Sequence, residues 1–489
     1  MSDYVNDLTN VEITTVLLPD SKTKQLQFLK RLQAVLSPEG TMSALVAGPS
    51  ANVFVIPHAV EQSICQKLNL ASSDAWNACL LNWGATHTNR LLMDAYVALT
   101  TRGSMVVDGE LMSSPKVIAV NPPPQKIDEA AFVPERFAGP YDWHIDDRGV
   151  NAVAAWRMFA ADPHFAGSLP WAGIRVAHID TGYTEHAALG WEHGQSSTVR
   201  ADEGKDFWDG SADTDGPRDP FLPGFPGHGT RISAAIAGYY PTANGGPFYG
   251  VAPGVQIIPF RVTDSVIIDH VQNSVRDAID KAIATNCHVV NISLGALRPS
   301  KSLAASLDAA YEAGLIVVCA AGQVWGEVIY PGRFNRCVTM GGVGPGLKPW
   351  RSAAKGIHVD LSGPADSIRR IRAESLPPKT TATELADQTG DGTSYATACC
   401  SGAAALWLAW HGIDALRDKY GPTGLWQIPK VFKYLATRYV TPGNWTADDE
   451  GNYGAGVLNI EAILKAPLPG AGTMRPENLA YGTFDDGSL

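Results

Sequence analysis

The sequence lacks the patterns of a membrane-spanning, nucleic-acid-binding or secreted protein. It has no run of about 18 or more apolar residues, the length that a transmembrane helix needs. It contains 38 Lys and Arg residues and 49 Asp and Glu residues. The resulting net charge of −11 disfavours nucleic-acid backbones and anionic membrane surfaces as partners. Its first residues carry no basic stretch before an apolar one, so a secretory signal is not expected.

Cysteine is scarce, and its pattern does not suggest disulfides. The 7 cysteines are widely spaced, odd in number and free of any C-x-x-C motif. Buried free thiols in a reducing compartment are therefore expected, which makes the cytoplasm the predicted location. The same pattern gives no reason to expect a zinc site or another resident metal.

Composition and length indicate a large globular protein with more than one part. Hydrophobic residues make up 45% and charged residues 18% of the 489 residues, which excludes disordered and coiled-coil proteins. Three successive prolines at 122–124 cannot support a helix or a central strand. We predict four parts: a small α+β domain (1–120), a Pro-rich linker (121–144), an α/β domain (145–465) and a tail (466–489). In the first part, strands are expected at 11–18, 52–58, 104–109 and 116–120, and helices at 22–36 and 89–102.

The third part has the pattern of an α/β protein. Its predicted strands are apolar throughout, which indicates a parallel sheet buried on both faces by helices. These strands are expected at 174–180, 255–262, 288–294, 314–322 and 337–343. Helices at 271–286 and 302–314 alternate with them. In such a fold the active site lies at the carboxyl ends of the strands.

Three polar side chains lie at predicted element boundaries of this domain. Asp180 ends the strand "VAHID" before Thr181-Gly182, His228 in "GHGT" begins a helix, and Ser394 in "GTSYAT" begins another. Singly, each has an ordinary explanation as a cap or a buried structural side chain. Together, an acid, a base and a hydroxyl at the boundaries of one α/β sheet predict a nucleophilic catalytic set.

These motifs resemble those of the subtilisin-like serine proteases, the subtilase superfamily of peptidase S8 type. Beside "HIDTGY", "GHGT" and "GTSYAT", the segments "GVNAVAAW", "GVAPGVQIIPFRV", "VVNISLG", "VVCAAG", "YPGRF", "VDLSGP" and "GAGVLNIEAIL" occur in the family's order. The resemblance covers about residues 145 to 465 and leaves 1–120 unmatched. It implies a mostly parallel sheet flanked by helices, and a serine endopeptidase of protein or peptide substrates without a cofactor.

The resemblance also implies a role for each motif residue. Ser394 would attack the scissile carbonyl, His228 would transfer the proton, and Asp180 would orient the imidazole. An extended peptide would pair with edge strands of the domain. The segments that resemble the walls of the pocket before the scissile bond comprise Ser293, Leu294, Gly295, Ala320, Ala321 and Gly322.

Gln323 departs from the family pattern at the oxyanion donor. The family usually has Asn after Ala-Ala-Gly, and its amide donates to the oxyanion. Gln323 keeps the amide on a side chain one methylene longer, so we expect it to serve as that donor. The alternatives are a displaced amide with slow catalysis, and a catalytically weak or dead binding or scaffold protein. Acyl transfer to an acceptor other than water would use the same acyl-enzyme.

Further departures lie near the pocket and after the nucleophile. Ile329 precedes Tyr330-Pro331, where relatives often have the Gly that floors the specificity pocket. A shallow pocket for small or medium side chains is therefore expected. Ala398 and the pair Cys399-Cys400 replace a Pro and a bulky residue, and we expect the thiols to serve in packing.

A long acidic segment separates the predicted acid from the base. Forty-eight positions lie from Asp180 to His228, more than is usual in the family. Calcium binding and a solvated surface loop are both possible for its carboxylates, and the irregular spacing favours the loop. The carboxylates concerned are Asp206, Asp209, Asp213, Asp215 and Asp219.

The N-terminal part occupies the place of a propeptide in secreted relatives. It is either a removable inhibitor, cut within about 120 to 145, or a permanent domain that recruits a substrate or partner. We favour the permanent domain, because a cytoplasmic protease needs its specificity constrained.

Overall fold

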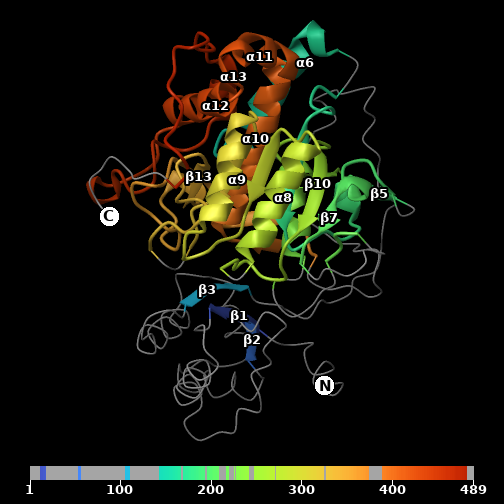
Figure 1. Cartoon of the computed structure of the whole chain (residues 1–489), viewed down its shortest axis with the longest axis vertical. Coiled ribbons are helices and arrows are strands. Elements are labelled where there is room, and N and C mark those ends of the chain that lie inside the picture. The colour runs from blue at the N-terminus through green and yellow to red at the C-terminus, as the bar shows by residue number, and fades with distance from the viewer. Residues whose placement is uncertain are drawn as a thin grey trace, which may run out of the picture.

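The computed structural model describes residues 12–17, 53–56, 105–110 and 142–481, with gaps at 167–168, 193–194, 209–215, 220–224, 226, 242–246, 270, 324–325 and 374–387. Strands β1 (Glu12–Leu17), β2 (Val53–Ile56) and β3 (Met105–Glu110) form an antiparallel sheet in the order β2-β1-β3 (Figure 1). They confirm three of the strands expected in the N-terminal part. The strand at 116–120, both helices of that part and most of the linker lie outside the described residues.

A parallel sheet of seven strands organises the rest of the described chain. Its order is β14-β13-β12-β11-β4-β10-β7, and every neighbouring pair is parallel. The strands are β4 (Arg175–Asp180), β7 (Lys205–Asp206), β10 (Gln256–Arg261), β11 (Val289–Ile292), β12 (Ile316–Ala320), β13 (Val338–Val343) and β14 (Leu361–Pro364). The expected α/β fold with a mostly parallel sheet is thus confirmed, whereas strands β7 and β14 were not predicted.

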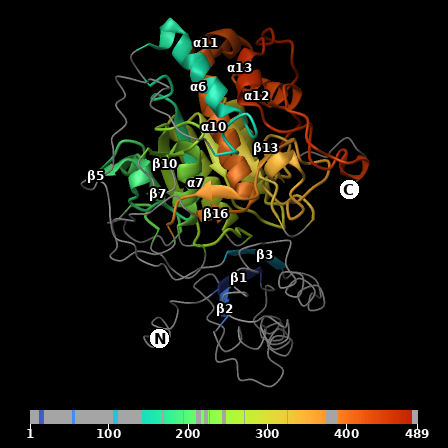
Figure 2. The ribbon, with the colours of Figure 1, turned by 180° about the vertical axis from the view of Figure 1, so that it is seen from behind.

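Helices cover both faces of this sheet. Figure 1 shows α8 and α9 in front of it, and Figure 2 shows α7 and α10 on the other face. The helices are α6 (Ala152–Ala161), α7 (His228–Ala237), α8 (Gln272–Ala284), α9 (Lys301–Glu312), α10 (Thr393–His411), α11 (Ile413–Tyr420), α12 (Gln427–Arg438) and α13 (Ile460–Lys465). None of these described helices has both the length and the hydrophobicity that a membrane crossing requires.

Short hairpins and turns complete the described part. The hairpins pair β5 (Trp191–Glu192) with β6 (Gln195–Ser196), β8 (Tyr239–Tyr240) with β9 (Phe248–Tyr249), and β15 (Ile368–Arg370) with β16 (Gln388–Gly390). Single 3₁₀ turns lie at Pro163–Phe165, Ala187–Leu189, Ala201–Glu203, Pro345–Leu347, Gly421–Thr423 and Ala447–Asp449.

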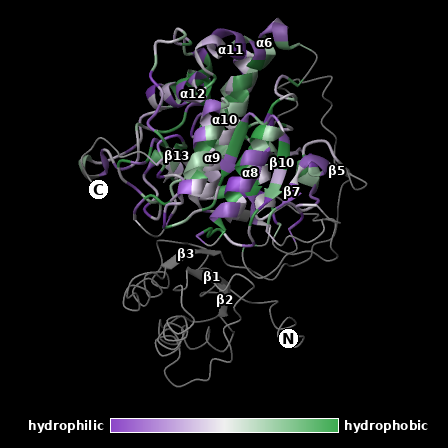
Figure 3. Cartoon of the chain, in the orientation of Figure 1, coloured by the Kyte–Doolittle hydropathy of each residue, from purple (hydrophilic) through white to green (hydrophobic). Residues whose placement is uncertain are grey.

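Successive residues of the central strands enter two separate apolar clusters. In β12, Ile316 and Val318 pack on the side of α10, while Val317 and Cys319 pack on the side of α8 and α9. This follows from the two-residue period of a strand, which places neighbouring side chains on opposite faces. Figure 3 shows the same layering, with apolar residues along the strands and hydrophilic residues on the outer surfaces of α8 and α9.

The chain after α13 is packed against the domain as far as residue 481. The hydroxyl of Tyr311 accepts a hydrogen bond from the Glu477 backbone N–H, and Asp308 accepts one from the Ala480 N–H. Lys430 on α12 forms an ion pair with Glu477. The last part of the predicted tail, 482–489, lies outside the described residues.

The strand order fixes where functional side chains gather. After β10 the chain crosses to the other side of β4 and forms β11, so the connections diverge at β4. Side chains that follow the carboxyl ends of β4, β11 and β12 therefore meet at one edge of the sheet, beside this switch point.

Candidate active site

Asp180 and His228 meet at this edge. Asp180 is the last residue of β4 and is fully buried. Its Oδ1 atom accepts hydrogen bonds from the Thr181 N–H at 2.8 Å and from His228 Nδ1 at 2.7 Å. Because a carboxylate can only accept, Nδ1 carries the proton, and the neutral imidazole has its lone pair at Nε2.

The glycines beside His228 allow the backbone to approach closely. His228 is the first residue of α7 and Gly227 before it has φ of 73°. A Cβ atom on Gly227 would lie 2.0 Å from the Ala373 carbonyl oxygen, and one on Gly229 would lie 2.1 Å from the Gly182 carbonyl oxygen. Any larger residue at either position would clash with these backbone atoms, so glycine is required on both sides of His228.

Ser394 lies on the other side of the imidazole. It is the second residue of α10, and its Oγ atom lies 3.3 Å from His228 Nε2. The hydroxyl also lies 3.3 Å from the Ser293 carbonyl oxygen. The distance to Nε2 is slightly longer than that of a typical hydrogen bond. The structure thus brings together the three residues singled out in the sequence.

The charge of Asp180 is held by its neighbours. Burial acts to raise the pKa of this carboxyl, but His228, His178 and the Thr181 N–H act against it, and its pKa lies below the usual range. A carboxylate is therefore maintained in an apolar interior, where it stabilises a positive charge on His228.

Gln323 is anchored beside the start of α10. The side chain is buried, and its Oε1 atom accepts a hydrogen bond from the Thr393 N–H at 3.0 Å. A Cβ atom on Gly392 would lie 3.3 Å from Oε1 and 3.8 Å from Nε2. The amide therefore lies along the turn that leads to Ser394, with its oxygen end fixed by the backbone.

Ile329 fills the space between the two predicted pocket walls. Residues 293–295 follow β11. Ala320 is the last residue of β12, and Ala321 and Gly322 follow it. All six residues are buried. A Cβ atom on Gly295 would lie 1.9 Å from Ile329 Cδ1, and one on Gly322 would lie 2.6 Å from the same atom. The isoleucine thus packs directly on the backbone of both walls.

Residues 266–268 pair with Gly295, in the first of these two walls. The Gly295 N–H donates to the Val266 carbonyl at 2.8 Å, and the Ile268 N–H donates to the Gly295 carbonyl at 2.9 Å. Asp269 then accepts hydrogen bonds from the Leu297 and Arg298 N–H groups. Sequence reasoning missed this pairing, because no local pattern reports which strand end a loop will meet.

Two of the acidic residues between Asp180 and His228 already have protein partners. Asp206 forms an ion pair with Arg261. Asp219 accepts hydrogen bonds from the Thr181 hydroxyl and the Gly227 N–H, and so links the segments that carry the acid and the base. Asp209, Asp213 and Asp215 lie outside the described residues. Within the described ranges, no three His, Cys, Asp or Glu side chains form a possible metal site. The surface loop stays the prediction for these carboxylates, and calcium binding stays its alternative.

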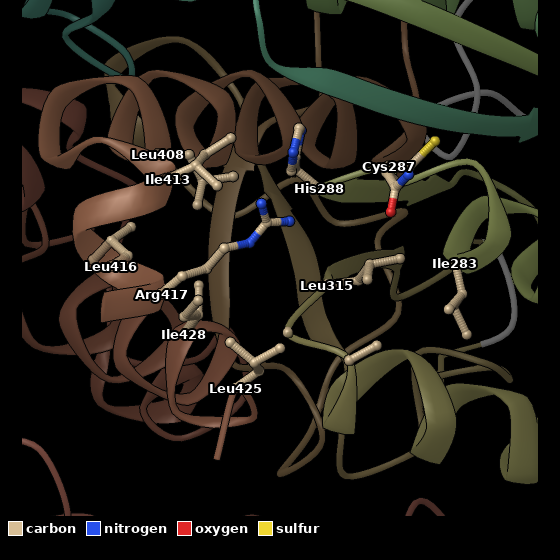
Figure 4. Close-up of a pocket in the computed structure, with 13 residues that line it drawn as sticks. Ile283, Cys287, His288, Leu315, Leu408, Ile413, Leu416, Arg417, Leu425 and Ile428 are labelled. Atoms are coloured by element: carbon tan, nitrogen blue, oxygen red, sulfur yellow. The ribbon is translucent and has the colours of Figure 1, made fainter. Parts of the chain in front are cut away.

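A separate cavity of about 380 Å³ lies at the opposite edge of the sheet. His288 precedes β11 and Leu315 precedes β12, so these lining residues mark the amino ends of the strands. Figure 4 shows Arg417 of α11 extending across this space toward His288. None of the residues of the proposed triad lines this cavity.

Asp391 controls the turn before α10. Its Oδ1 atom accepts a hydrogen bond from the Ser367 N–H at 2.7 Å, while the Gly392 N–H donates to the Ala365 carbonyl. Burial raises the pKa of Asp391 to about 6, and the nearby Asp366 carboxylate acts in the same direction. A titratable carboxyl group therefore lies in the turn that leads to Ser394.

A profile of the subtilase family matches residues 172–417. The chain belongs to the subtilase family. It is 26% identical over 316 residues to Subtilisin Savinase from Lederbergia lenta, an alignment that covers 63% of this chain and 97% of that protein. It is equally identical to an alkaline protease from Alkalihalobacillus alcalophilus, over 63% of this chain and 68% of that protein.

The fold comparison agrees with the family. A protease structure from Pseudoalteromonas arctica PAMC 21717 matches with a TM-score of 0.50 and 20% identity, over 66% of this chain and 96% of that one. This subtilase is accordingly a serine-type endopeptidase that acts on proteins or peptides, and an Asp/His/Ser triad is typical of its family. The resemblance recognised in the sequence motifs is confirmed.

We predict that Asp391→Asn stabilises this subtilase above pH 6. The native carboxyl has a pKa of about 6, and the unfolded one titrates near 3.9, so the native state binds the extra proton between these values. Ionised Asp391 therefore destabilises the fold at neutral pH and loses this effect as pH falls toward 4. Asn keeps the acceptor for Ser367 and carries no charge.

Urea unfolding of Ser394→Ala and Ser394→Ala/Asp391→Asn at pH 7.5 and 4.0 measures the difference without self-digestion. A gain of roughly 1 kcal/mol at pH 7.5 is expected, reduced from the full shift because the side chain is not completely buried. At pH 4.0 the two proteins should be equal. An equal gain at both pH values would contradict the charge explanation.

Proposed function

We propose that Asp180, His228 and Ser394 carry out the peptide hydrolysis of this subtilase. The observation that supports this assignment most directly is the position of His228, with Nδ1 2.7 Å from Asp180 and Nε2 3.3 Å from Ser394. A buried carboxylate, an oriented imidazole and a hydroxyl at a helix N-terminus are the parts that acyl transfer to serine requires.

The chemical steps follow from this arrangement. Ser394 Oγ forms a bond to the substrate carbonyl carbon while its proton passes to His228 Nε2. The C–N bond then breaks, and His228 returns the proton to the leaving amine. Water attacks the acyl-enzyme with His228 again as the base, which releases the acid and restores Ser394. Asp180 stabilises the imidazolium that forms in each step.

The oxyanion that forms in each attack would accept hydrogen bonds from two donors. The Ser394 N–H lies in the first turn of α10, where a helix offers no internal acceptor and its dipole favours negative charge. The amide of Gln323 lies beside the same turn, held by the Thr393 N–H. We propose that Gln323 Nε2 is the second donor.

Labelling with a fluorophosphonate probe tests the assignment of the triad. Intact-mass analysis and peptide mapping should find one adduct on Ser394 in the wild type and none in Ser394→Ala. Ser401→Ala is the matched control, because Ser401 is another buried serine of α10 and its loss should leave labelling intact. An adduct on another residue, or an unlabelled wild type, would sink the assignment.

Removal of the Gln323 amide N–H should lower kcat about 100- to 1000-fold with little change in KM, as expected for a donor used mainly in the transition state. Gln323→Leu removes both ends of the amide, whereas Gln323→Glu keeps an acceptor for the Thr393 N–H. Steady-state kinetics on one peptide should show a loss in both variants. Full activity of Gln323→Glu would show that the residue acts only as a structural acceptor.

We further propose that the specificity is restricted and favours small or medium residues before the scissile bond. Ile329 fills the space between Gly295 and Gly322, which supports a shallow pocket. The pairing of Gly295 with Val266 and Ile268 supports restriction along the cleft as well. An extended substrate beside residues 293–295 would have to displace this segment or bind without that pairing.

Ile329→Gly should shift cleavage toward large residues at the position before the scissile bond. Profiling with a peptide library should show Ala, Ser, Val or similar residues for the wild type, and Leu, Phe or Tyr for the variant. Val328→Ala, a change at the preceding buried position, should keep the wild-type profile. A wild-type preference for Phe, Tyr or Arg would refute the shallow pocket.

We place this activity in the cytoplasm and propose no nucleic-acid or membrane partner. Support comes from the net charge of −11 and from five buried free thiols in the described chain. One of them is Cys399 in α10. Burial raises the pKa of its thiol to about 12. The residues 1–120 would then form a permanent domain that recruits a substrate or partner.

A further inference from the structure

A second histidine lies beneath the proposed triad. His178 lies in the buried part of β4, two residues before Asp180, so both side chains point to the same face of the strand. It is only 1% exposed. Its partner across the sheet is Asn291 of β11, so a polar pair interrupts the core directly below the site.

Asn291 fixes the tautomer of this histidine. The Asn291 Oδ1 atom accepts a hydrogen bond from the Ser401 hydroxyl at 2.8 Å, which orients the amide. Its Nδ2 atom then donates to His178 Nδ1 at 3.2 Å and to the Ser293 hydroxyl at 3.1 Å. Since Nδ1 of His178 accepts, a neutral ring carries its proton on Nε2.

The Nε2–H of His178 faces the proposed acid and the backbone of the proposed base. It donates to the Gly229 carbonyl at 3.0 Å, one residue after His228. It also lies 3.7 Å from Asp180 Oδ2. No hydrogen-bond partner for Oδ2 occurs among the described residues, so this N–H is the polar group directed at the second carboxylate oxygen.

His178 is held in the neutral form. Burial lowers its pKa, Asp180 acts against this, and His228 adds to the lowering. These are the titratable groups that act on it, from its own strand and from α7. The other elements present the neutral Asn291, Ser401 and, on β10, Pro259. A charged His178 would compete with His228 for Asp180, so the neutral form suits the proposed mechanism.

We propose that His178 is a positioning residue of the triad, whose Nε2–H holds the Gly229 carbonyl and directs its positive end at Asp180 Oδ2. The proposal rests on the assignment of Asp180, His228 and Ser394 made above. The Gly229 bond fixes the backbone that carries His228. The N–H dipole also offsets part of the carboxylate charge, and so makes the protonated form of His228 less favourable.

A purely structural histidine would affect only folding, whereas a positioning residue also changes the pH at which the base titrates. In His178→Val the N–H is lost, so the protonated His228 becomes more favourable. The acid limb of the kcat/KM profile should move up by roughly 0.5 to 1 pH unit. We also expect kcat to fall about tenfold, because His228 is less firmly held.

Matched variants separate the N–H from the volume of the ring. Gln at position 178 places its amide N–H near the Nε2 position, so His178→Gln should keep the wild-type acid limb. The shorter Asn reaches only the Nδ1 position, so His178→Asn should behave like His178→Val. Cys400→Ala removes buried volume from α10 outside this network, and it should lower the melting temperature without moving the limb.

The experiment records kcat/KM from pH 5 to 9, the melting temperature and fluorophosphonate labelling for each full-length variant. An unchanged acid limb and kcat in folded His178→Val would overturn the proposal. If His178→Val does not fold, equal limbs for the Gln and Asn variants would overturn it, and a shift for Asn alone would support it. Failure of the wild type to be labelled at Ser394 would instead refute the triad assignment.

Discussion

The site depends on one buried negative charge. Asp180 has no exposure to solvent, and a carboxylate in such a place is stable only when donors and cations surround it. Thr181, His228 and His178 supply these partners, and Asp219 ties the Thr181 hydroxyl to the Gly227 N–H. Protein groups thus replace water around the Asp180 carboxylate, and His228 is held in position as one of these groups.

The segments expected to line the substrate pocket already contact other parts of the chain. Ile329 contacts the backbone of both walls, and the segment at 266–268 uses the main-chain groups of Gly295. Both features involve Gly295, in one of the segments expected to line the pocket. Under the proposed function, selection between substrates would occur where the peptide backbone binds and not at the reacting groups.

The sequence predicted what depends on local pattern and on motif residues. The apolar runs located β4 and β10 to β13. Neighbouring Gly and Thr residues marked Asp180, His228 and Ser394 as candidate site residues. It did not predict β14, because "LSGP" lacks the β-branched residues of a strand. The contacts of His178 with Asn291 and of Gly295 with Val266 join residues far apart in sequence, and only the parallel pairing of strands brings them together. The one local signal for the first of these was a histidine within an apolar strand.

The burial of α10 has a consequence for the lifetime of the enzyme. Every residue of this helix from Thr393 to Ala409 is buried, and the helix begins at the nucleophile. An endopeptidase in solution meets many copies of itself, and it can cut only chain that is extended and accessible. This helix cannot be presented in that form while the domain is folded. Self-digestion of the folded domain is therefore confined to surface segments, and cleavage of α10 requires global unfolding. The rate of unfolding thus limits the rate at which the helix that carries Ser394 is cut.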